Sequence, residues 1–185
     1  MKTLKVIFSV IIAFIFLIII IYAYYGGFKK VNFQPAIQGG EILVYEEVLG
    51  DYAQSGAVMD RIYNSLLKRE KIETFKGFGI YYDNPKEVEK SKLRSMVGCI
   101  LEKNDSAKLN GLKKNYKIKS CRKGTYITAE FPFKGKMSVM IGILKVYPAM
   151  NKYIKVNRLS EKGAVMEIYD MPNKKILYRK EIAEK

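Results

Sequence analysis

The sequence of 185 residues contains no histidine, no tryptophan and only two cysteines. Without histidine, the protein cannot form a Ser-His or Cys-His catalytic pair, or a histidine-ligated zinc or haem site. Two cysteines, Cys99 and Cys121, are too few for a metal site of four thiolates. These absences exclude many common enzyme classes, and we expect no metal site, no cofactor and no residue that can be named as catalytic.

Acidic residues are also scarce, with 18 Asp and Glu against 33 Lys and Arg, a net charge of +15. No glycine-rich phosphate loop and no nucleic-acid-binding motif accompanies this charge, so no nucleic-acid partner is expected. Beside a bilayer, such a basic surface would attract anionic lipid. The alternative is an ordinary solvated surface of scattered lysines.

The first 30 residues contain a long apolar run. Val6 to Tyr25 is 20 residues without a charge, which as a helix spans about 30 Å, the thickness of a bilayer core. The alternative is a cleaved signal peptide, but the run exceeds the usual apolar region of about 7–15 residues and no small-residue cleavage site follows it. We therefore predict that residues 1–30 are an N-terminal membrane anchor with its span at residues 6–25.

Basic residues flank both ends of this span. Lys2, Lys5 and the α-amino group precede it, and Lys29 and Lys30 follow it. The excess of one charge on the N-terminal side favours a cytoplasmic N-terminus. The protein is thus expected to be a single-pass protein of the cell membrane with its soluble domain on the extracytoplasmic side.

The remaining 155 or so residues suit one domain. Residues 31–40, with Pro35 and Gly39-Gly40, are expected to be a tether, and residues 41–185 the domain. Apolar periodicity predicts amphipathic helices at 54–70 and 138–157, the second with Pro148 inside it and hence a kink or restart there. Alternating segments predict strands at 41–48, 77–83, 95–102, 124–133, 163–170 and 175–182. Residues 103–123 are expected to be a connector with a short helix.

The order strand-helix-strand-strand occurs twice, and the letters repeat with it. YDNP at residues 82–85 matches YDMP at 169–172, an offset of 87, and Ile62-Tyr63 matches Val146-Tyr147, an offset of 84. The expected fold is therefore α+β: two duplicated units that form an antiparallel sheet with both helices on one face, preceded by one transmembrane helix.

Several phrases resemble a known family. GIYYDNP, GTYITAEFPFKG, KVYPAMNKYI and MEIYD, in this element order, resemble the GyrI-like small-molecule-binding domain over about residues 41–183. That domain is also the effector-binding part of AraC-type and multidrug-sensing regulators, but no DNA-binding domain is seen here. The likeness extends to the animal single-pass receptor of ER autophagy, which places this domain directly behind a membrane helix. That receptor carries its autophagy motif in a long tail, whereas this sequence stops at Lys185, so we do not expect its function here.

The resemblance implies a ligand cleft between the two halves and a glutamate in a Glu-x-Tyr pattern, here Glu167-Ile168-Tyr169. In multidrug-sensing relatives this acid meets cationic aromatic ligands, and in a hydrolytic branch it helps to activate water. On a strand, Met166 and Ile168 share the apolar face that suits the helices, so Glu167 is expected on the open face. At the offset of 87 residues, the residue of the first repeat that corresponds to Glu167 is Ile80, so this position changes from apolar to acidic between the repeats. The alternative is a solvated glutamate on a half-exposed strand.

Aromatic residues fall on the elements that border the cleft in this family, although some of them will be plain core. With Glu167 and Tyr169, the predicted ligand-binding residues are Tyr45, Tyr82, Tyr126, Phe131, Phe133 and Tyr147. The Gly50-Asp51-Tyr52 turn resembles the family's turn at the mouth of the cleft. A disulfide between Cys99 and Cys121 is left open.

Three functions are compatible with these features. The first is a membrane-anchored module that senses or sequesters an amphipathic or cationic small organic ligand. The second is a hydrolase of small electrophilic compounds, with Glu167 as base and Tyr147 or Tyr169 as an orienting hydroxyl. The third is a docking module whose basic face binds lipid or protein and whose cleft is empty.

Overall fold

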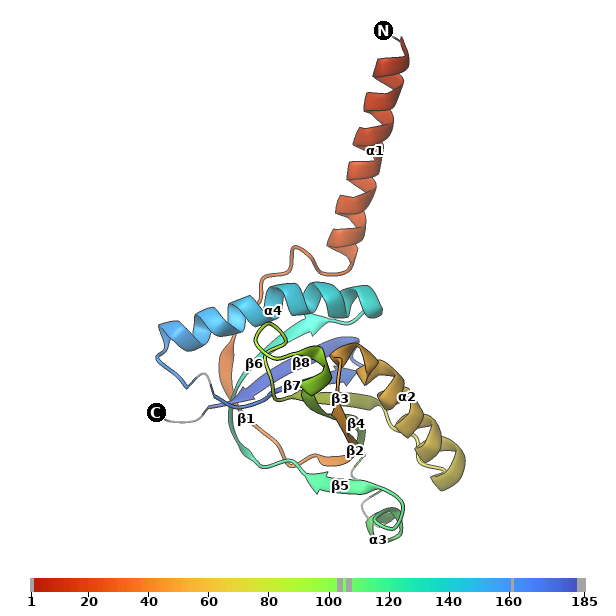
Figure 1. Ribbon diagram of the computed structural model, residues 1–185, viewed down its shortest axis with the longest axis vertical. Coiled ribbons are helices and arrows are strands. Elements are labelled where there is room, and N and C mark those ends of the chain that lie inside the picture. The colour runs from red at the N-terminus through yellow and green to blue at the C-terminus, as the bar shows by residue number, and fades with distance from the viewer. Residues whose placement is uncertain (1, 103–104, 106–107, 161, 183–185) are drawn as a thin grey trace.

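The computed structural model describes residues 2–102, 105, 108–160 and 162–182, which form a long N-terminal helix and a mixed α+β domain (Figure 1). The helices are α1 (Lys2–Tyr24), α2 (Ser55–Ser65), α3 (Leu109–Leu112) and α4 (Lys136–Val156). The strands are β1 (Gln34–Gln38), β2 (Ile42–Leu49), β3 (Lys76–Tyr81), β4 (Arg94–Leu101), β5 (Lys117–Ser120), β6 (Gly124–Pro132), β7 (Val165–Asp170) and β8 (Lys175–Glu181). Shorter 3-10 turns at Tyr52–Gln54 and Lys90–Lys92 and a π-helical turn at Leu66–Glu70 complete the elements.

The strands form one antiparallel sheet in the order β1-β6-β8-β7-β3-β4-β2-β5. The units β2-α2-β3-β4 and β6-α4-β7-β8 have the same internal pairing, and they join where β3 pairs with β7 at the centre. The predicted α+β class and the duplicated unit are confirmed.

Both long helices of the domain pack on one face of the sheet. Val146, Met150 and Ile154 of α4 cover β6, β7 and β8, while Val58 and Ile62 of α2 cover β2 and β4. Helix α4 runs through Pro148 without the restart that the proline suggested. Burial of apolar residues on both sides of Pro148 supplies the stabilisation that the lost backbone hydrogen bond does not.

The two outermost strands were not predicted. β1 lies within residues 31–40, expected to be a tether, and β5 lies within the expected connector. Both are short and mostly exposed at the edges of the sheet, so their sequences carry no strong alternation. Phe33, just before β1, is buried against the α4 core, and Tyr25 and Val31 pack beside it. The segment behind α1 is therefore part of the domain.

Helix α1 projects from the domain (Figure 1), and the side chains of Thr3–Tyr24 are exposed. Among the described residues it is the one helix long and apolar enough to cross a membrane, judged by length and composition. Its end contacts the domain directly: Lys145 of α4 donates to the carbonyl oxygen of Gly27, and the Lys134 ammonium lies 4.1 Å from the centre of the Tyr24 ring. These contacts attach the end of α1 to the domain.

Candidate ligand-binding site

Glu167 lies in the middle of β7 and is only 2% exposed. Its neighbours across the sheet are Gly79 of β3 and Tyr178 of β8. It faces α4, so the expectation that it points to the open face is wrong. Met166 and Ile168 instead pack on the opposite face, in an apolar cluster that includes Leu43, Phe78, Met96 and Ile100. Both faces of the sheet carry apolar clusters, and the alternation of β7 alone could not identify the face that the helices cover.

Two tyrosine hydroxyls donate hydrogen bonds to the Glu167 carboxylate. Tyr147 of α4 lies 2.8 Å from one oxygen, and Tyr169, two residues along β7, lies 2.6 Å from the other. The two donors come from different layers of the fold, so the carboxylate joins the helix to the sheet. Charge-assisted hydrogen bonds of this kind are stronger than neutral ones.

Two further tyrosines complete the cluster, and glycines make room for them. A Cβ atom on Gly79 would lie 2.5 Å from the Tyr81 hydroxyl, and one on Gly142 of α4 would lie 2.5 Å from the Tyr178 hydroxyl. These glycines are required because a tyrosine ring end occupies the space of their missing side chains. We refer to Glu167 with Tyr81, Tyr147, Tyr169 and Tyr178 as the tyrosine cluster.

Burial governs the acid–base properties of the tyrosine cluster. It raises the pKa of Glu167, against the opposing effect of the Tyr169 and Tyr147 hydrogen bonds. Burial and then the nearby Glu167 charge raise the pKa of Tyr81 to about 12, and raise the pKa values of Tyr147 and Tyr169 well above their ordinary range. The hydroxyls therefore remain donors at neutral pH, and they stabilise the carboxylate of Glu167 when it is ionised.

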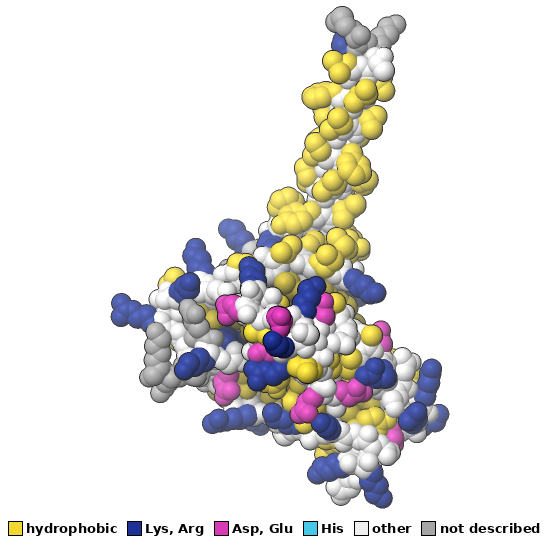
Figure 2. Space-filling view, viewed as in Figure 1, with side chains coloured by type: hydrophobic (Ala, Val, Ile, Leu, Met, Phe, Trp, Pro, Cys, Tyr) yellow, Lys and Arg dark blue, Asp and Glu magenta, His cyan; other side chains and the backbone are white. Residues whose placement is uncertain are grey.

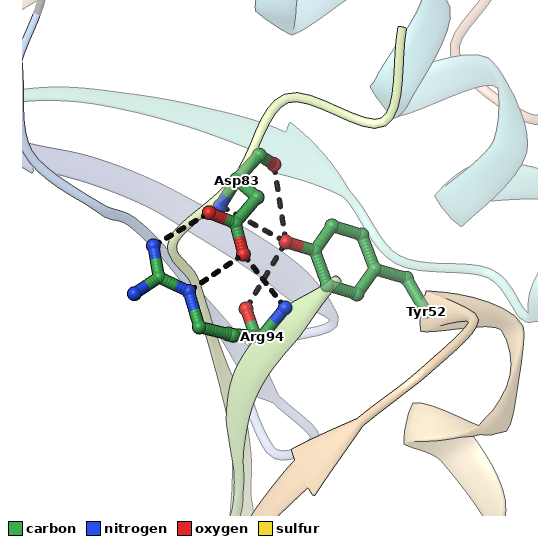
Figure 3. A network of polar contacts seen from close by, with 3 residues as sticks. All are labelled: Tyr52, Asp83 and Arg94. Carbon is green, nitrogen blue, oxygen red and sulfur yellow. Dashed lines mark hydrogen bonds and ion pairs between the residues drawn. The ribbon is translucent and has the colours of Figure 1, made fainter. Parts of the chain in front are cut away.

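Tyr52, Asp83 and Arg94 form a polar network (Figure 3). The Tyr52 hydroxyl lies 3.0 Å from both the backbone nitrogen and the carbonyl oxygen of Asp83 and 3.1 Å from the carbonyl oxygen of Arg94. The Arg94 guanidinium holds Asp83 at 2.7 and 3.0 Å, which lowers the pKa of that carboxyl. The Tyr52 ring lies 4.8 Å from that of Tyr81. The network thus connects the turn before α2 and the end of β3 to the tyrosine cluster.

Replacing Tyr52 by phenylalanine is expected to lower the melting temperature of the full chain by roughly 2–4 °C, because the Asp83 and Arg94 backbone groups lose a shared partner worth about 1 kcal/mol. Thermal unfolding followed by near-ultraviolet circular dichroism measures this. Tyr63→Phe is the control, since the Tyr63 hydroxyl makes no hydrogen bond with any described residue. Equal melting temperatures for wild type and Tyr52→Phe would contradict the role assigned to the network.

The structure brings some of the predicted binding residues together. Tyr147, Tyr169 and Glu167 are in direct contact, and the Phe133 ring lies 5.9 Å from that of Tyr169. Phe131 is fully buried in the same core, beside Gly142. These five predicted residues occupy one region on the helix-covered face.

Three predicted residues lie elsewhere. Tyr45 packs in the apolar cluster on the opposite face of the sheet. Tyr126 donates to the carbonyl oxygen of Arg122 on that same face, because its position in β6 alternates with the helix-facing Ile127 and Phe131. Tyr82 is 42% exposed and lines a cavity of about 340 Å³ at the edge of the domain, which Glu167 does not border. Strand alternation puts Tyr45 and Tyr126 on the face opposite the tyrosine cluster, and Tyr82 follows the end of β3.

Tyr81, Tyr178, Gly79 and Gly142 were not anticipated. The signal for Tyr81 was available, since alternation puts it on the same face as Gly77 and Gly79. Predicting that Tyr178 lies beside Glu167 would have required the pairing register of β7 and β8, which the sequence does not reveal.

A second cavity of about 630 Å³ lies on the opposite face, bordered by Lys29, Lys30, Lys76 and Lys175, and by Glu41, Glu130 and Asp170. No group of three or more Asp, Glu or Cys within the described residues could hold a metal ion.

The sequence pattern of the GyrI-like small molecule binding domain matches residues 40–181. The chain belongs to this family. Its fold is shared with the EcmrR C-terminal domain, at a TM-score of 0.59 and 9% identity over 84% of this chain and 99% of that one. SAV2435 bound to tetraphenylphosphonium has the same fold, at a TM-score of 0.55 and 11% identity over 82% and 94% of the two chains.

Among characterised proteins, the GyrI-like chain is similar to human Testis-expressed protein 264, with 30% identity over 123 residues. The mouse homologue matches to the same extent. The alignment covers 63% of this chain and 37% of the human protein, so the match spans little more than a third of that relative's length.

Proposed function

We propose that this GyrI-like protein is a membrane-anchored module that binds an amphipathic organic cation at the tyrosine cluster and senses or sequesters it. The observation that carries the proposal is Glu167, an acid buried at the centre of the sheet with no basic partner among the described residues. A buried carboxylate without a counter-charge is costly, and natural proteins keep such groups mainly at functional sites.

The chemistry of the cluster suits such a ligand. A cation that entered would find the carboxylate, and the faces of four tyrosine rings attract cations through their quadrupoles. Glu167 is 2% exposed and borders neither of the two cavities described above, so the rings must move apart to admit a ligand. The fold neighbour SAV2435 is described with tetraphenylphosphonium, a lipophilic cation of this class, which supports the choice of probe.

Isothermal titration of the full chain in neutral detergent with tetraphenylphosphonium tests this function. Glu167→Gln should weaken binding at least about tenfold, because the amide keeps the size of the carboxylate and removes its charge. Glu130→Gln is the matched control: Glu130 lies on β6 in an exposed pair with Lys175, 2.6 Å away, and should bind as wild type does. No binding by wild type, or equal binding by both variants, would contradict the proposal.

A second candidate is the hydrolase, favoured by the raised pKa of Glu167 and its two tyrosine hydroxyls, which resemble a general base with orienting groups. Turnover of an ester or cyclopropane probe that disappears in Glu167→Gln and survives in Glu130→Gln would establish it. Turnover that is insensitive to Glu167→Gln would refute it.

The same proposal places residues 6–25 across the cell membrane, with the domain on the extracytoplasmic side. Protease added to intact cells that express the full chain should then remove the domain and leave α1 protected. Digestion only after the cells are permeabilised would reverse the orientation and leave the ligand site unaffected.

A further inference from the structure

The outer surface of α4 carries exposed apolar side chains where the helix passes the end of α1. Met137, Met140, Ile143 and Leu144 are 43%, 59%, 45% and 74% exposed, and we call these four residues the α4 platform. Phe28, in the segment that follows α1, is 67% exposed. Large apolar residues that gather on one surface of a protein mark a place of contact with a partner or a membrane.

The duplicated helix α2 shows that the fold does not require this apolar surface. In the sequence repeat that aligns Ile62-Tyr63 with Val146-Tyr147, Leu144 corresponds to Asp60 and Met140 to Gly56. Asp60 is exposed on α2, together with Arg61 and Asn64. Both helices bury equivalent inner faces, so the difference between their outer faces reflects what covers α4 alone.

The position of α4 indicates what that covering is. Figure 1 shows α4 lying across the end of α1, and Lys145 of α4 binds the Gly27 carbonyl oxygen at this junction. Gly26 also sits close to Phe131 and Pro132, since a Cβ atom there would lie 2.6 Å from the proline ring. If α1 crosses a bilayer, α4 lies along the surface of that bilayer with the α4 platform turned toward it.

The charges around α4 fit an anionic surface. Residues 131–160 contain six Lys and Arg and no Asp or Glu. Of the lysines among them, Lys134, Lys136, Lys152 and Lys155 are exposed. Figure 2 shows basic side chains on both sides of the place where the apolar α1 meets the domain. Apolar residues with flanking lysines are the features of a helix that lies in the membrane interface.

We propose that α4 is an interfacial helix, whose platform inserts into the headgroup region of an anionic bilayer and fixes the domain against the membrane. This inference rests on the membrane anchoring proposed above and not on the ligand. As a consequence, the outer face of α4 contacts the bilayer. The inner face of the same helix contacts Glu167 through the Tyr147 hydroxyl. A ligand dissolved in the bilayer would then meet the tyrosine cluster beside the surface that concentrates it.

The absence of tryptophan provides the test. The full chain with Leu144→Trp carries a single tryptophan, and Asp60→Trp places the same reporter at the corresponding exposed position of α2. Each variant is reconstituted into vesicles of phosphatidylcholine and phosphatidylglycerol with bromine atoms high on the acyl chains. At an insertion depth of about 5–10 Å, the bromines should remove roughly half the emission of Leu144→Trp and little of that of Asp60→Trp.

The possible results separate the two proposals. Vesicle flotation first reports whether the chain is anchored; failure to float overturns the anchoring and this inference with it, while ligand binding in detergent is unaffected. A chain that floats but shows equal, weak quenching of both reporters overturns the inference alone. Emission of Leu144→Trp that shifts with protein concentration but resists bromine would show that a second copy covers α4, which also overturns it. If Leu144→Trp is quenched equally in vesicles of pure phosphatidylcholine, the lysines around α4 do not attract the helix to anionic lipid, and that part of the inference is refuted.

Discussion

Replacing Arg179 by alanine is expected to lower the melting temperature of the full chain by roughly 10 °C, which corresponds to about 3–5 kcal/mol for a broken buried ion pair. Arg179 has no exposed surface, although it lies on β8 in the face opposite the helices. The loss combines an unpaired acid with a cavity in the sheet.

The environment of Arg179 explains the size of the effect. Its two terminal nitrogens bind the two Glu41 oxygens at 2.8 and 3.0 Å, and one of them lies 3.0 Å from the Met166 sulfur. The Tyr126 ring covers the guanidinium at 5.2 Å. Burial alone would lower the pKa of Arg179, but the Glu41 carboxylate outweighs it and raises that pKa. The pair holds the β8 strand to the segment that enters β2, far apart in the sequence.

Two further variants separate charge from packing. Lys175→Ala removes a cation from the same strand, but its pair with Glu130 is partly exposed and should contribute less than about 1 kcal/mol. Arg179→Met with Glu41→Gln leaves no unpaired charge and should recover about half of the lost stability. Thermal unfolding by circular dichroism measures all four proteins. Equal melting temperatures for Arg179→Ala and Lys175→Ala would show that the buried pair of Arg179 and Glu41 is not stabilising.

The sequence was sufficient for the central sheet and both long helices. Their apolar periodicity was clear, and the match of Ile62-Tyr63 to Val146-Tyr147 identified buried positions that are equivalent in α2 and α4. The edge strands β1 and β5 could not be predicted in the same way. They are paired on one side only, so their polar residues carry no pattern of burial.

The face of the sheet that Glu167 occupies was predicted wrongly, for a reason of register. Aligning the repeats at an offset of 87 paired Glu167 with Ile80, but Ile80 faces the opposite side of the sheet and Gly79 lies beside Glu167. A register error of one residue reverses the face of every side chain on a strand. Glu167 and Tyr169 lie two residues apart on one strand, so the Glu-x-Tyr pattern puts them on the same face whatever the register. The faces of Tyr45 and Tyr126 do depend on register, and both rings lie on the face opposite the tyrosine cluster. Cys99 and Cys121 lie on opposite faces as free thiols.

Glu167→Gln is expected to change how stability depends on pH as well as to weaken binding. Burial raises the pKa of Glu167 in the folded protein above its ordinary value of 4.5. As the pH rises past that ordinary value, the unfolded chain releases the proton of Glu167 while the folded protein retains it. The unfolded state then binds fewer protons, so wild type loses stability until the pH exceeds the raised pKa.

Glutamine has no such titration, and every other ionisable group is common to the two proteins. The difference in melting temperature should therefore be small near pH 4 and grow with pH, so that Glu167→Gln melts at least about 2 °C above wild type once the pH exceeds the raised pKa. Melting curves of both proteins from pH 4 to 8 measure it, with Glu130→Gln as a control that follows wild type. A difference that is constant across this range would mean that Glu167 titrates as an ordinary glutamate. A growing difference would instead show that the buried Glu167 carboxylate lowers the stability of the fold, as expected for the cation-binding site proposed above.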